Sequence, residues 1–327
     1  MVLTEDACMK YPRHLTAPLI VLAGIIQALF SGCTTMPSRA ERIALEQFRQ
    51  TDGAKRLALW PVPYKERLIP TRFGTTYAIE SGRADGQVML LVHAMGFNAM
   101  TWAPNIDSLG KDYRVIALDT IGDQGKSVVR RDYPKTGAEY ADWMVDIIDS
   151  LGEEKVVLVG CSMGGWIALN TAVEYPSRVS ALVLNSPAAG LPVKTTWMKY
   201  LNDIIFTSSV EKHRKAARFL LGNGRATRDW VEYMVEVVAD TGGAKMGIPS
   251  DIKAEKLALL DMPILLLVGT DEVIYENKQA VFETGRSLLP SVHCEWIPDA
   301  GHMGHYDNPD FVNSIVEEFL AGKLVRE

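Results

Sequence analysis

One serine in this 327-residue chain stands where a nucleophile would be useful. Residues 160–164 read Gly-Cys-Ser-Met-Gly, which places Ser162 between two glycines directly after the apolar run Val156–Gly160. A sharp strand-to-helix turn exposes such a hydroxyl, and the residues two before and two after it must be small. Gly160 and Gly164 meet that requirement. We therefore expect Ser162 to be a nucleophile, and the alternative is a glycine-rich turn without chemistry.

A serine hydroxyl reacts only when a base takes its proton, so a histidine oriented by an acid is required. His302 follows the last predicted strand, His293–Ile297, and precedes a predicted helix, Asp310–Leu320, which makes it the favoured base. His305 lies close by, but no H-E-x-x-H signature accompanies it, so a metal is not expected. We expect His305 to be a surface residue or one that supports His302 from behind.

The acid has two candidates. The predicted strand Ile264–Gly269 is followed by Thr270, Asp271 and Glu272. Adjacent carboxylates point in different directions, so only one of them can face His302. The spacing by itself leaves the choice between Asp271 and Glu272 open.

Several elements must position these residues. From about residue 64 onward, short apolar runs bounded by Gly, Asp and Pro alternate with helical patterns, which predicts an α/β fold with buried parallel strands. The predicted strands are Gln87–Val92, Arg114–Leu118, Val156–Gly160, Ala181–Asn185, Ile264–Gly269 and His293–Ile297. Apolar residues on one face of 139–151 predict a helix that covers the sheet.

The alternation breaks between residues 190 and 260, where helical patterns follow one another. We interpret this segment as a helical cap over the carboxyl ends of the strands, where such sheets bind ligands. Its apolar and aromatic residues favour a hydrophobic substrate.

The order serine, acid, histidine, together with the glycine-flanked serine, resembles the α/β-hydrolase superfamily over roughly residues 64–320. The resemblance implies a mostly parallel, twisted sheet with helices on both faces. It also implies that the acid lies three residues after the strand-ending glycine, which is Glu272, with Asp271 as the alternative. The run Gly-Thr-Asp-Glu-Val-Ile-Tyr looks like a branch of bacterial carboxylesterase-like hydrolases.

An oxyanion needs two aimed N–H donors. One is expected from the main chain of Met163. The resemblance implies that the other is the main chain of Met95, in the loop His93-Ala94-Met95-Gly96, where Ala94 replaces the usual glycine. His93 is expected to be a buried structural residue, and Asp119 to shape the loop after its strand.

These features predict a serine hydrolase that cleaves carboxylic esters through an acyl-enzyme, without a metal or organic cofactor. The substrate is expected to be a small ester with an apolar acyl group. A cofactor-free perhydrolase, a carbon–carbon bond hydrolase and a non-catalytic, membrane-tethered binding protein remain alternatives. Ser162 disfavours haloalkane dehalogenases and epoxide hydrolases, which resemble this frame but carry an aspartate at that turn.

The overall charge argues against a nucleic-acid partner. The formal net charge is −6, and no clustered run of Lys and Arg is present. The absence of a G-x-G-x-x-G element after a predicted strand also disfavours a nucleotide enzyme. Cys161 and Cys294 are expected to be buried thiols that do not pair.

The first residues resemble a lipoprotein leader. Lys10 and Arg13 precede the apolar run Leu15–Phe30, which is shorter than the roughly 20 residues of a spanning helix. Residues 29–34 resemble a bacterial lipobox, with Phe30 where Leu, Val or Ile is preferred, so we expect lipidation at Cys33. Translation from Met9 is an alternative to Met1. The resemblance implies a protein of the cell envelope on the periplasmic or extracellular side, with Thr34 favouring the outer membrane of a Gram-negative host.

The expected organisation is therefore a signal peptide over residues 1–32, a tether over 33–62, a core over 63–189 and 261–327, and a cap over 190–260.

Overall fold

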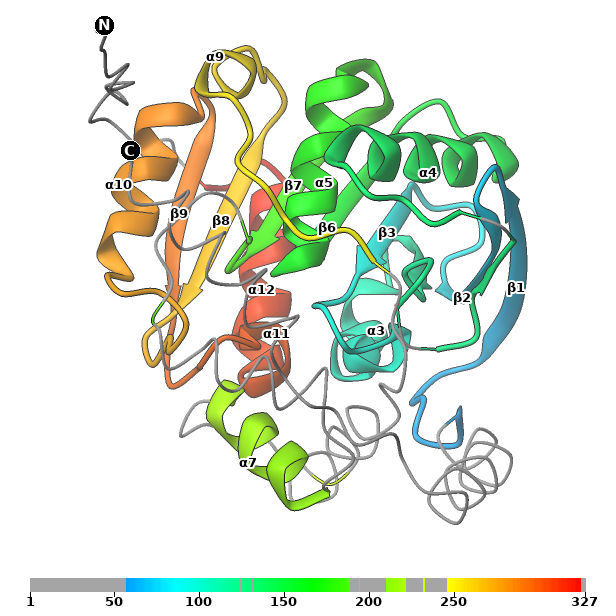
Figure 1. Ribbon diagram of the computed structural model, residues 1–327, viewed down its shortest axis with the longest axis horizontal. Helices are drawn as coiled ribbons and strands as arrows, with labels where there is room; N and C mark the ends of the chain where they lie inside the picture. The colour runs from blue at the N-terminus through cyan, green and yellow to red at the C-terminus, as the bar shows by residue number, and fades with distance from the viewer. Residues whose placement is uncertain are drawn as a thin grey trace, which may run out of the picture. The chain divides into compact units, whose positions relative to one another are not determined.

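The computed structural model describes residues 57–123, 125–130, 132–188, 194, 210–221, 232 and 246–324. Within them, nine strands form one sheet in the order β1-β2-β4-β3-β6-β7-β8-β9, with β5 paired to β2 (Figure 1). The strands are β1 (Tyr64–Thr71), β2 (Gly74–Gly82), β3 (Val88–Val92), β4 (Arg114–Leu118), β5 (Val128–Val129), β6 (Val156–Cys161), β7 (Val179–Asn185), β8 (Ile264–Gly269) and β9 (Val292–Ile297). All pairs from β4 to β9 are parallel, and β1, β2 and β5 join antiparallel at one end. The predicted mostly parallel α/β sheet is confirmed.

The six predicted strands match β3, β4, β6, β7, β8 and β9, with small shifts at their ends. The strands β1, β2 and β5 are not among those predicted from the sequence. Most side chains of β1 are exposed, because it lies at the edge of the sheet, and its charged residues include Lys65, Glu66 and Arg67. A half-solvated edge strand lacks the continuous apolar run that marks the central strands.

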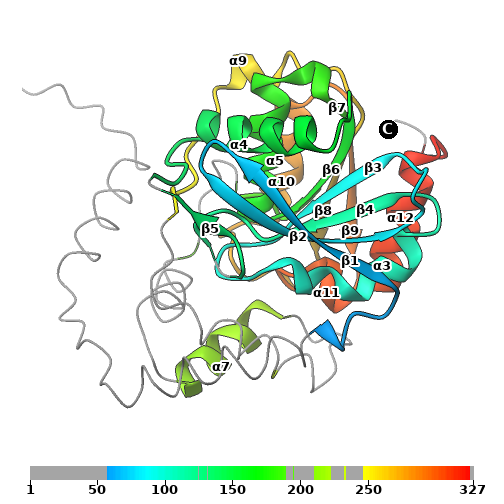
Figure 2. The same cartoon turned by 90° about the vertical axis from the view of Figure 1, so that its right-hand side faces the viewer.

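Helices cover both faces of the sheet. The described helices are η1 (Ala99–Trp102), α3 (Ala103–Leu109), α4 (Gly137–Ser150), α5 (Met163–Glu174), η2 (Pro176–Arg178), α7 (Val210–Leu220), α9 (Ala254–Leu257), α10 (Gln279–Leu288), α11 (Gly304–Asp307) and α12 (Pro309–Leu320). Figure 2 shows α4, α5 and α10 over one face and α3 and α12 over the other. A hydrophobic core lies on each face of the sheet, and successive residues of β3 point into opposite cores: Leu90 packs on the α4 side and Leu91 on the α3 side.

Helix α4 illustrates how the sequence sets a helix start. The Thr136 hydroxyl accepts the Glu139 N–H while the Glu139 carboxylate accepts the Thr136 N–H, a capping box that fixes the first turn. Tyr140, Met144 and Ile147 are buried against the sheet, as the periodicity of 139–151 predicts.

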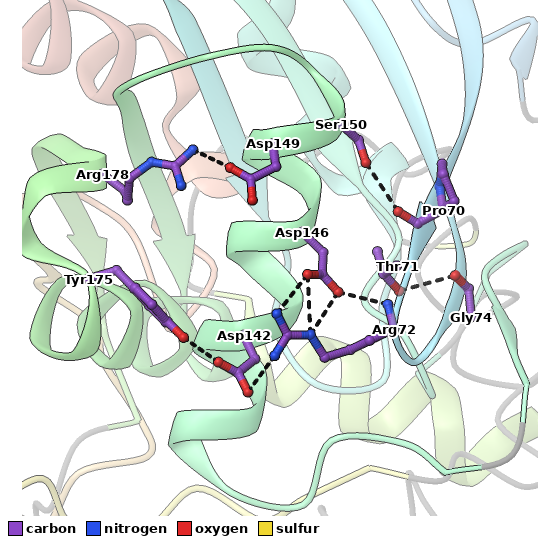
Figure 3. Close-up of polar contacts among 10 residues, drawn as sticks. All are labelled: Pro70, Thr71, Arg72, Gly74, Asp142, Asp146, Asp149, Ser150, Tyr175 and Arg178. Carbon is purple, nitrogen blue, oxygen red and sulfur yellow. Dashed lines mark hydrogen bonds and ion pairs between the residues drawn. The ribbon is translucent and has the colours of Figure 1, made fainter.

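A polar network fastens the outer face of α4 to its neighbours (Figure 3). In the β1–β2 turn, the Arg72 guanidinium lies 2.8 Å from carboxylate oxygens of both Asp142 and Asp146. The Tyr175 hydroxyl, just after α5, donates to Asp142, and Arg178 pairs with Asp149 at 2.7 Å. The network therefore links the edge hairpin, α4 and the end of α5.

Much of the predicted cap lies outside the described residues, including Trp197, Tyr200, Trp230 and Tyr233. In α7, Ala216, Ala217 and Leu220 are buried in the same core as α3 and α12. The predicted leader, Cys33 and the first part of the predicted tether also lie outside the described residues. At the tether's described end, Trp60 is buried and its Nε1 donates to Ser81 Oγ at 2.9 Å. In the part of the chain that the structure describes, no helix has the length and apolarity to cross a membrane.

Candidate active site

Ser162 occupies a strained turn between β6 and α5. Its backbone has φ 51° and ψ −113°, a conformation that residues other than glycine rarely adopt. The glycines around it allow the strand and the helix to approach. A Cβ on Gly160 would come within 2.3 Å of the Gly164 backbone, and a Cβ on Gly164 within 2.1 Å of the Val92 carbonyl. The small residues predicted at these positions are therefore sterically required.

The turn is held on both sides by the chain that leaves β7. The Ser162 N–H donates to the Asn185 carbonyl at 3.0 Å. The Ser162 carbonyl accepts the N–H of Ala188 at 2.9 Å and, as the first bond of α5, that of Trp166 at 3.1 Å. Main-chain hydrogen bonds thus fix the strained residue without using its hydroxyl.

His302 lies in the loop between β9 and α11 and is buried. Its carbonyl accepts the Asn185 Nδ2 at 3.1 Å, and the Cys161 thiol lies 3.8 Å from the same oxygen. Its N–H donates to the carbonyl of Leu220, the last residue of α7, at 2.9 Å. The His302 loop is therefore joined both to the strand end that carries Ser162 and to a helix of the inserted segment.

The Glu272 carboxylate faces the His302 imidazole. Nδ1 of His302 lies 3.0 Å from Oε2 and 3.2 Å from Oε1 of Glu272. Oε1 also accepts the N–H groups of Val273 and Ile274 at 2.9 and 2.8 Å. Burial by itself raises the pKa of the Glu272 carboxyl, but the His302 charge and these hydrogen bonds outweigh it and hold that pKa below its usual value. The carboxylate is thus ionised and set to stabilise a positive imidazole.

Of the two predicted acids, Glu272 is the one seen in contact with His302. Asp271 is half-buried, and its N–H donates to the Ala300 carbonyl at 2.8 Å. The turn after β8 explains the difference, because the Glu272 N–H closes back on the Gly269 carbonyl at 3.1 Å and places Glu272 deeper than Asp271.

The two predicted oxyanion donors lie near the Ser162 turn. Met163 is the first residue of α5, where an N–H has no partner within the helix. Met95 lies in a turn closed by the Phe97 N–H and the Ala94 carbonyl, in which Gly96 takes φ 81°. A Cβ on Gly164 would come within 2.8 Å of the His93 carbonyl, so the Met95 loop passes directly over the start of α5. Their role as donors stays a prediction.

His93 and Asp119 hold the loops around this turn, as the sequence predicts. His93 Nδ1 lies 2.7 Å from the Ala94 carbonyl, and Nε2 accepts the Thr120 N–H at 2.9 Å. Burial lowers the pKa of His93 to about 4. The Asp119 carboxylate accepts the N–H groups of Ala99 and Lys126, and burial raises its pKa to about 6.

His305 is fully buried, so the expectation of a surface position is wrong. Its ring packs on Trp102 with centroids 4.0 Å apart, and burial lowers its pKa to about 3. The Asn105 Nδ2 donates to the His305 carbonyl at 3.0 Å, and the Gly301 N–H donates to Asp307 at 2.8 Å. These contacts support the His302 loop from behind, and the irregular sequence of the loop offers no periodic signal for them.

Cys161 and Cys294 are both buried and are not joined to each other. Burial raises the pKa of the Cys161 thiol, so it stays protonated. No group of three or more His, Cys, Asp or Glu side chains among residues with described coordinates is arranged to hold a metal ion.

The chain matches the model of the alpha/beta hydrolase family over residues 89–315. It is similar to the uncharacterized carboxylesterase nap of Bacillus subtilis, with 33% identity over 272 residues, covering 81% of this chain and 89% of that protein. It is also similar to carboxylesterase YbfK of Bacillus subtilis, with 30% identity, covering 82% of this chain and 92% of that protein. The crystal structure of naproxen esterase from Bacillus subtilis superposes with a TM-score of 0.76 at 30% identity, covering 87% of this chain and 99% of that one.

Proposed function

The chain belongs to the alpha/beta hydrolase family and is a carboxylesterase-like hydrolase, and from that premise we propose that it cleaves carboxylic esters through Ser162, His302 and Glu272. The contact that carries the proposal is the buried pair of Glu272 and His302, whose loop is hydrogen-bonded to Asn185 beside the Ser162 turn. A base paired with a carboxylate near a half-buried, strained serine is the arrangement that activates a hydroxyl.

The proposed reaction has two steps. Ser162 Oγ attacks the ester carbonyl while the His302 imidazole takes its proton, and the Glu272 carboxylate stabilises the resulting imidazolium. The N–H groups of Met163 and Met95 donate to the oxyanion of the tetrahedral intermediate. His302 then gives the proton to the departing alkoxide. Water, deprotonated by His302, releases the acid from the acyl-enzyme.

A panel of nitrophenyl esters from acetate to dodecanoate, assayed with wild type and Ser162→Ala, tests this proposal. We expect hydrolysis of short to medium chains and its loss in the variant. Undiminished activity in Ser162→Ala contradicts the assignment. Inert esters, together with turnover of a peracid-forming mixture or of a vinylogous diketone, would instead assign the perhydrolase or the carbon–carbon bond hydrolase.

We propose further that the chain is lipid-anchored through Cys33. The support is the cationic start, the apolar run and the small residues before this cysteine. Two or more acyl chains on one terminus give stable membrane attachment. Cys33→Ser is expected to move the protein out of the membrane fraction or to block its processing, and unchanged fractionation would reject lipidation at that thiol.

A further inference from the structure

Asn185 lies where the Ser162 turn and the His302 loop meet. It is the last residue of β7 and pairs with Cys161 of β6 on one side and Leu267 of β8 on the other. Its side chain is buried, and the chain turns sharply after it, with φ 43° at Ser186. The sequence offers no signal for this position, which reads as an ordinary end of a buried strand.

The main chain of Asn185 fixes the Ser162 turn. Its carbonyl accepts the Ser162 N–H at 3.0 Å, and Ala188, three residues further along, donates to the Ser162 carbonyl at 2.9 Å. The position of the strained serine is therefore set relative to the end of β7.

The side chain of Asn185 fixes the His302 loop. Its Nδ2 donates to the His302 carbonyl at 3.1 Å and to the Cys161 sulfur at 3.3 Å. The carbonyl of His302 can only accept, so the amide nitrogen, and not the oxygen, must face it. The remaining Oδ1 faces Gly304, where a Cβ would come within 2.8 Å of it, and it is buried without a hydrogen-bond partner in the structure.

Burial of a polar amide side chain is unfavourable for folding, and an apolar side chain of similar size would avoid that cost. The benefit that this asparagine brings is the connection itself. Asn185 contacts both Cys161, which precedes the proposed nucleophile, and His302, the proposed base. Cys161 and His302 are 141 residues apart in the sequence.

We infer that Asn185 is a positioning residue, which sets the separation of the Ser162 hydroxyl from the His302 imidazole through its carbonyl and its amide. The inference rests on the proposed function. It follows that loss of the amide donor slows acyl transfer while substrate binding is retained, because a displacement of about 1 Å in a reacting group reduces the rate by roughly 100-fold.

The test compares Asn185→Ala and Asn185→Asp with a matched control, Asn170→Ala. Asn170 is also a buried asparagine, and its Nδ2 donates to the Trp166 carbonyl at 2.8 Å, but within α5. Asn185→Asp keeps the size of the side chain and replaces the donor by an oxygen. For each folded variant, kcat and KM for nitrophenyl butyrate and the urea midpoint are measured.

We expect both Asn185 variants to lose about 10- to 100-fold in kcat with KM changed by less than about threefold. Asn170→Ala is expected to lower the urea midpoint with kcat within about twofold of wild type. A wild-type kcat in either folded Asn185 variant overturns the inference. Failure of both to fold overturns it as well, because Asn185 would then serve the stability of the sheet.

Ser162→Ala, assayed in parallel, separates this result from the fate of the proposed function. Activity that survives in Ser162→Ala refutes the proposed function. An inactive Ser162→Ala beside fully active Asn185 variants refutes the role of Asn185 alone.

Discussion

Two buried histidines follow two strands of the same sheet, and they differ in what faces their rings. In the loop after β3, both ring nitrogens of His93 are engaged by main-chain groups, those of Ala94 and Thr120. In the loop after β9, Nδ1 of His302 faces the ionised carboxylate of Glu272 at 3.0 Å. A buried imidazole that gains a proton needs a negative partner, since a charge in a low-dielectric interior is costly otherwise.

The difference shows that burial and proximity to the Ser162 turn do not make a base. The His93 carbonyl lies at the start of α5, within 2.8 Å of where a Cβ on Gly164 would be, yet burial lowers the pKa of His93 to about 4 and its Nε2 lone pair already accepts the Thr120 N–H. The carboxyl of Glu272, in contrast, keeps a lowered pKa despite burial, because His302 and main-chain N–H groups stabilise its charge. A carboxylate also lies near His93, since Asp123 Oδ2 is 3.9 Å from Nδ1, but it is farther away than Glu272 is from His302 and it accepts the Gly96 N–H. The close contact with a carboxylate therefore distinguishes the two sites.

The largest expected effect comes from removing the proposed base. His302→Asn should reduce kcat for nitrophenyl esters by about 10,000-fold or more, because no other group would accept the Ser162 proton. The matched control is His305→Asn, a buried histidine three residues further along in α11, which should stay within about tenfold of wild type. Equal losses in the two variants would mean that the loop, and not the imidazole at 302, matters.

Removal of the charge behind the base should have the next largest effect. Glu272→Gln keeps the shape of the side chain and is expected to lower kcat by roughly 1,000-fold, because the imidazolium loses its partner. Asp271→Asn serves as the control and should change kcat by less than about twofold. A larger loss in Asp271→Asn than in Glu272→Gln would reverse the assignment of the acid.

A change at the structural histidine should affect stability more than chemistry. His93→Ala removes the acceptor of the buried Thr120 N–H and leaves a cavity, so we expect the free energy of unfolding to fall by about 3 kcal/mol. Urea unfolding followed by fluorescence measures it. An unchanged midpoint would contradict the structural role of this ring.

The smallest predicted effect is a pH dependence of stability. The pKa of His93 is lowered from 6.5 to about 4, so between these values the unfolded chain binds a proton that the folded chain does not. The contribution of His93 to stability is therefore complete above pH 6.5 and decreases by about 1.4 kcal/mol for each pH unit below it, until the folded pKa is reached. The difference between wild type and His93→Ala, measured from pH 7 to about pH 5, should show this slope. A difference that does not change with pH would contradict it.

The fold could largely be predicted because its central strands are continuous apolar runs, such as Ile264–Gly269, which matches β8 residue for residue. The edge strand β1 could not, because its mixed polar and apolar residues resemble a loop. The need for small residues at 160 and 164 could be predicted from the sequence motif alone, and the structure shows that a Cβ at either glycine would clash with backbone atoms.

The contacts of the residues that support the site could not be predicted for a different reason. The burial of His305 against Trp102 and the amide bridge of Asn185 join segments that are distant in sequence, and neither has a local pattern. Asp271 and Glu272 are adjacent, so their spacing alone could not separate them; the family resemblance favoured Glu272, and the direction of the chain after Gly269 places it against His302. Contacts of this kind follow from the assembled sheet.

Labelling with a fluorophosphonate, followed by peptide mass spectrometry, tests most directly whether a single activated serine is the centre of this molecule. We expect one adduct per chain on the peptide that contains Ser162, no adduct in Ser162→Ala, and strongly slowed labelling in His302→Asn. An adduct on another residue, or a folded wild-type protein that takes up no label, would contradict the account.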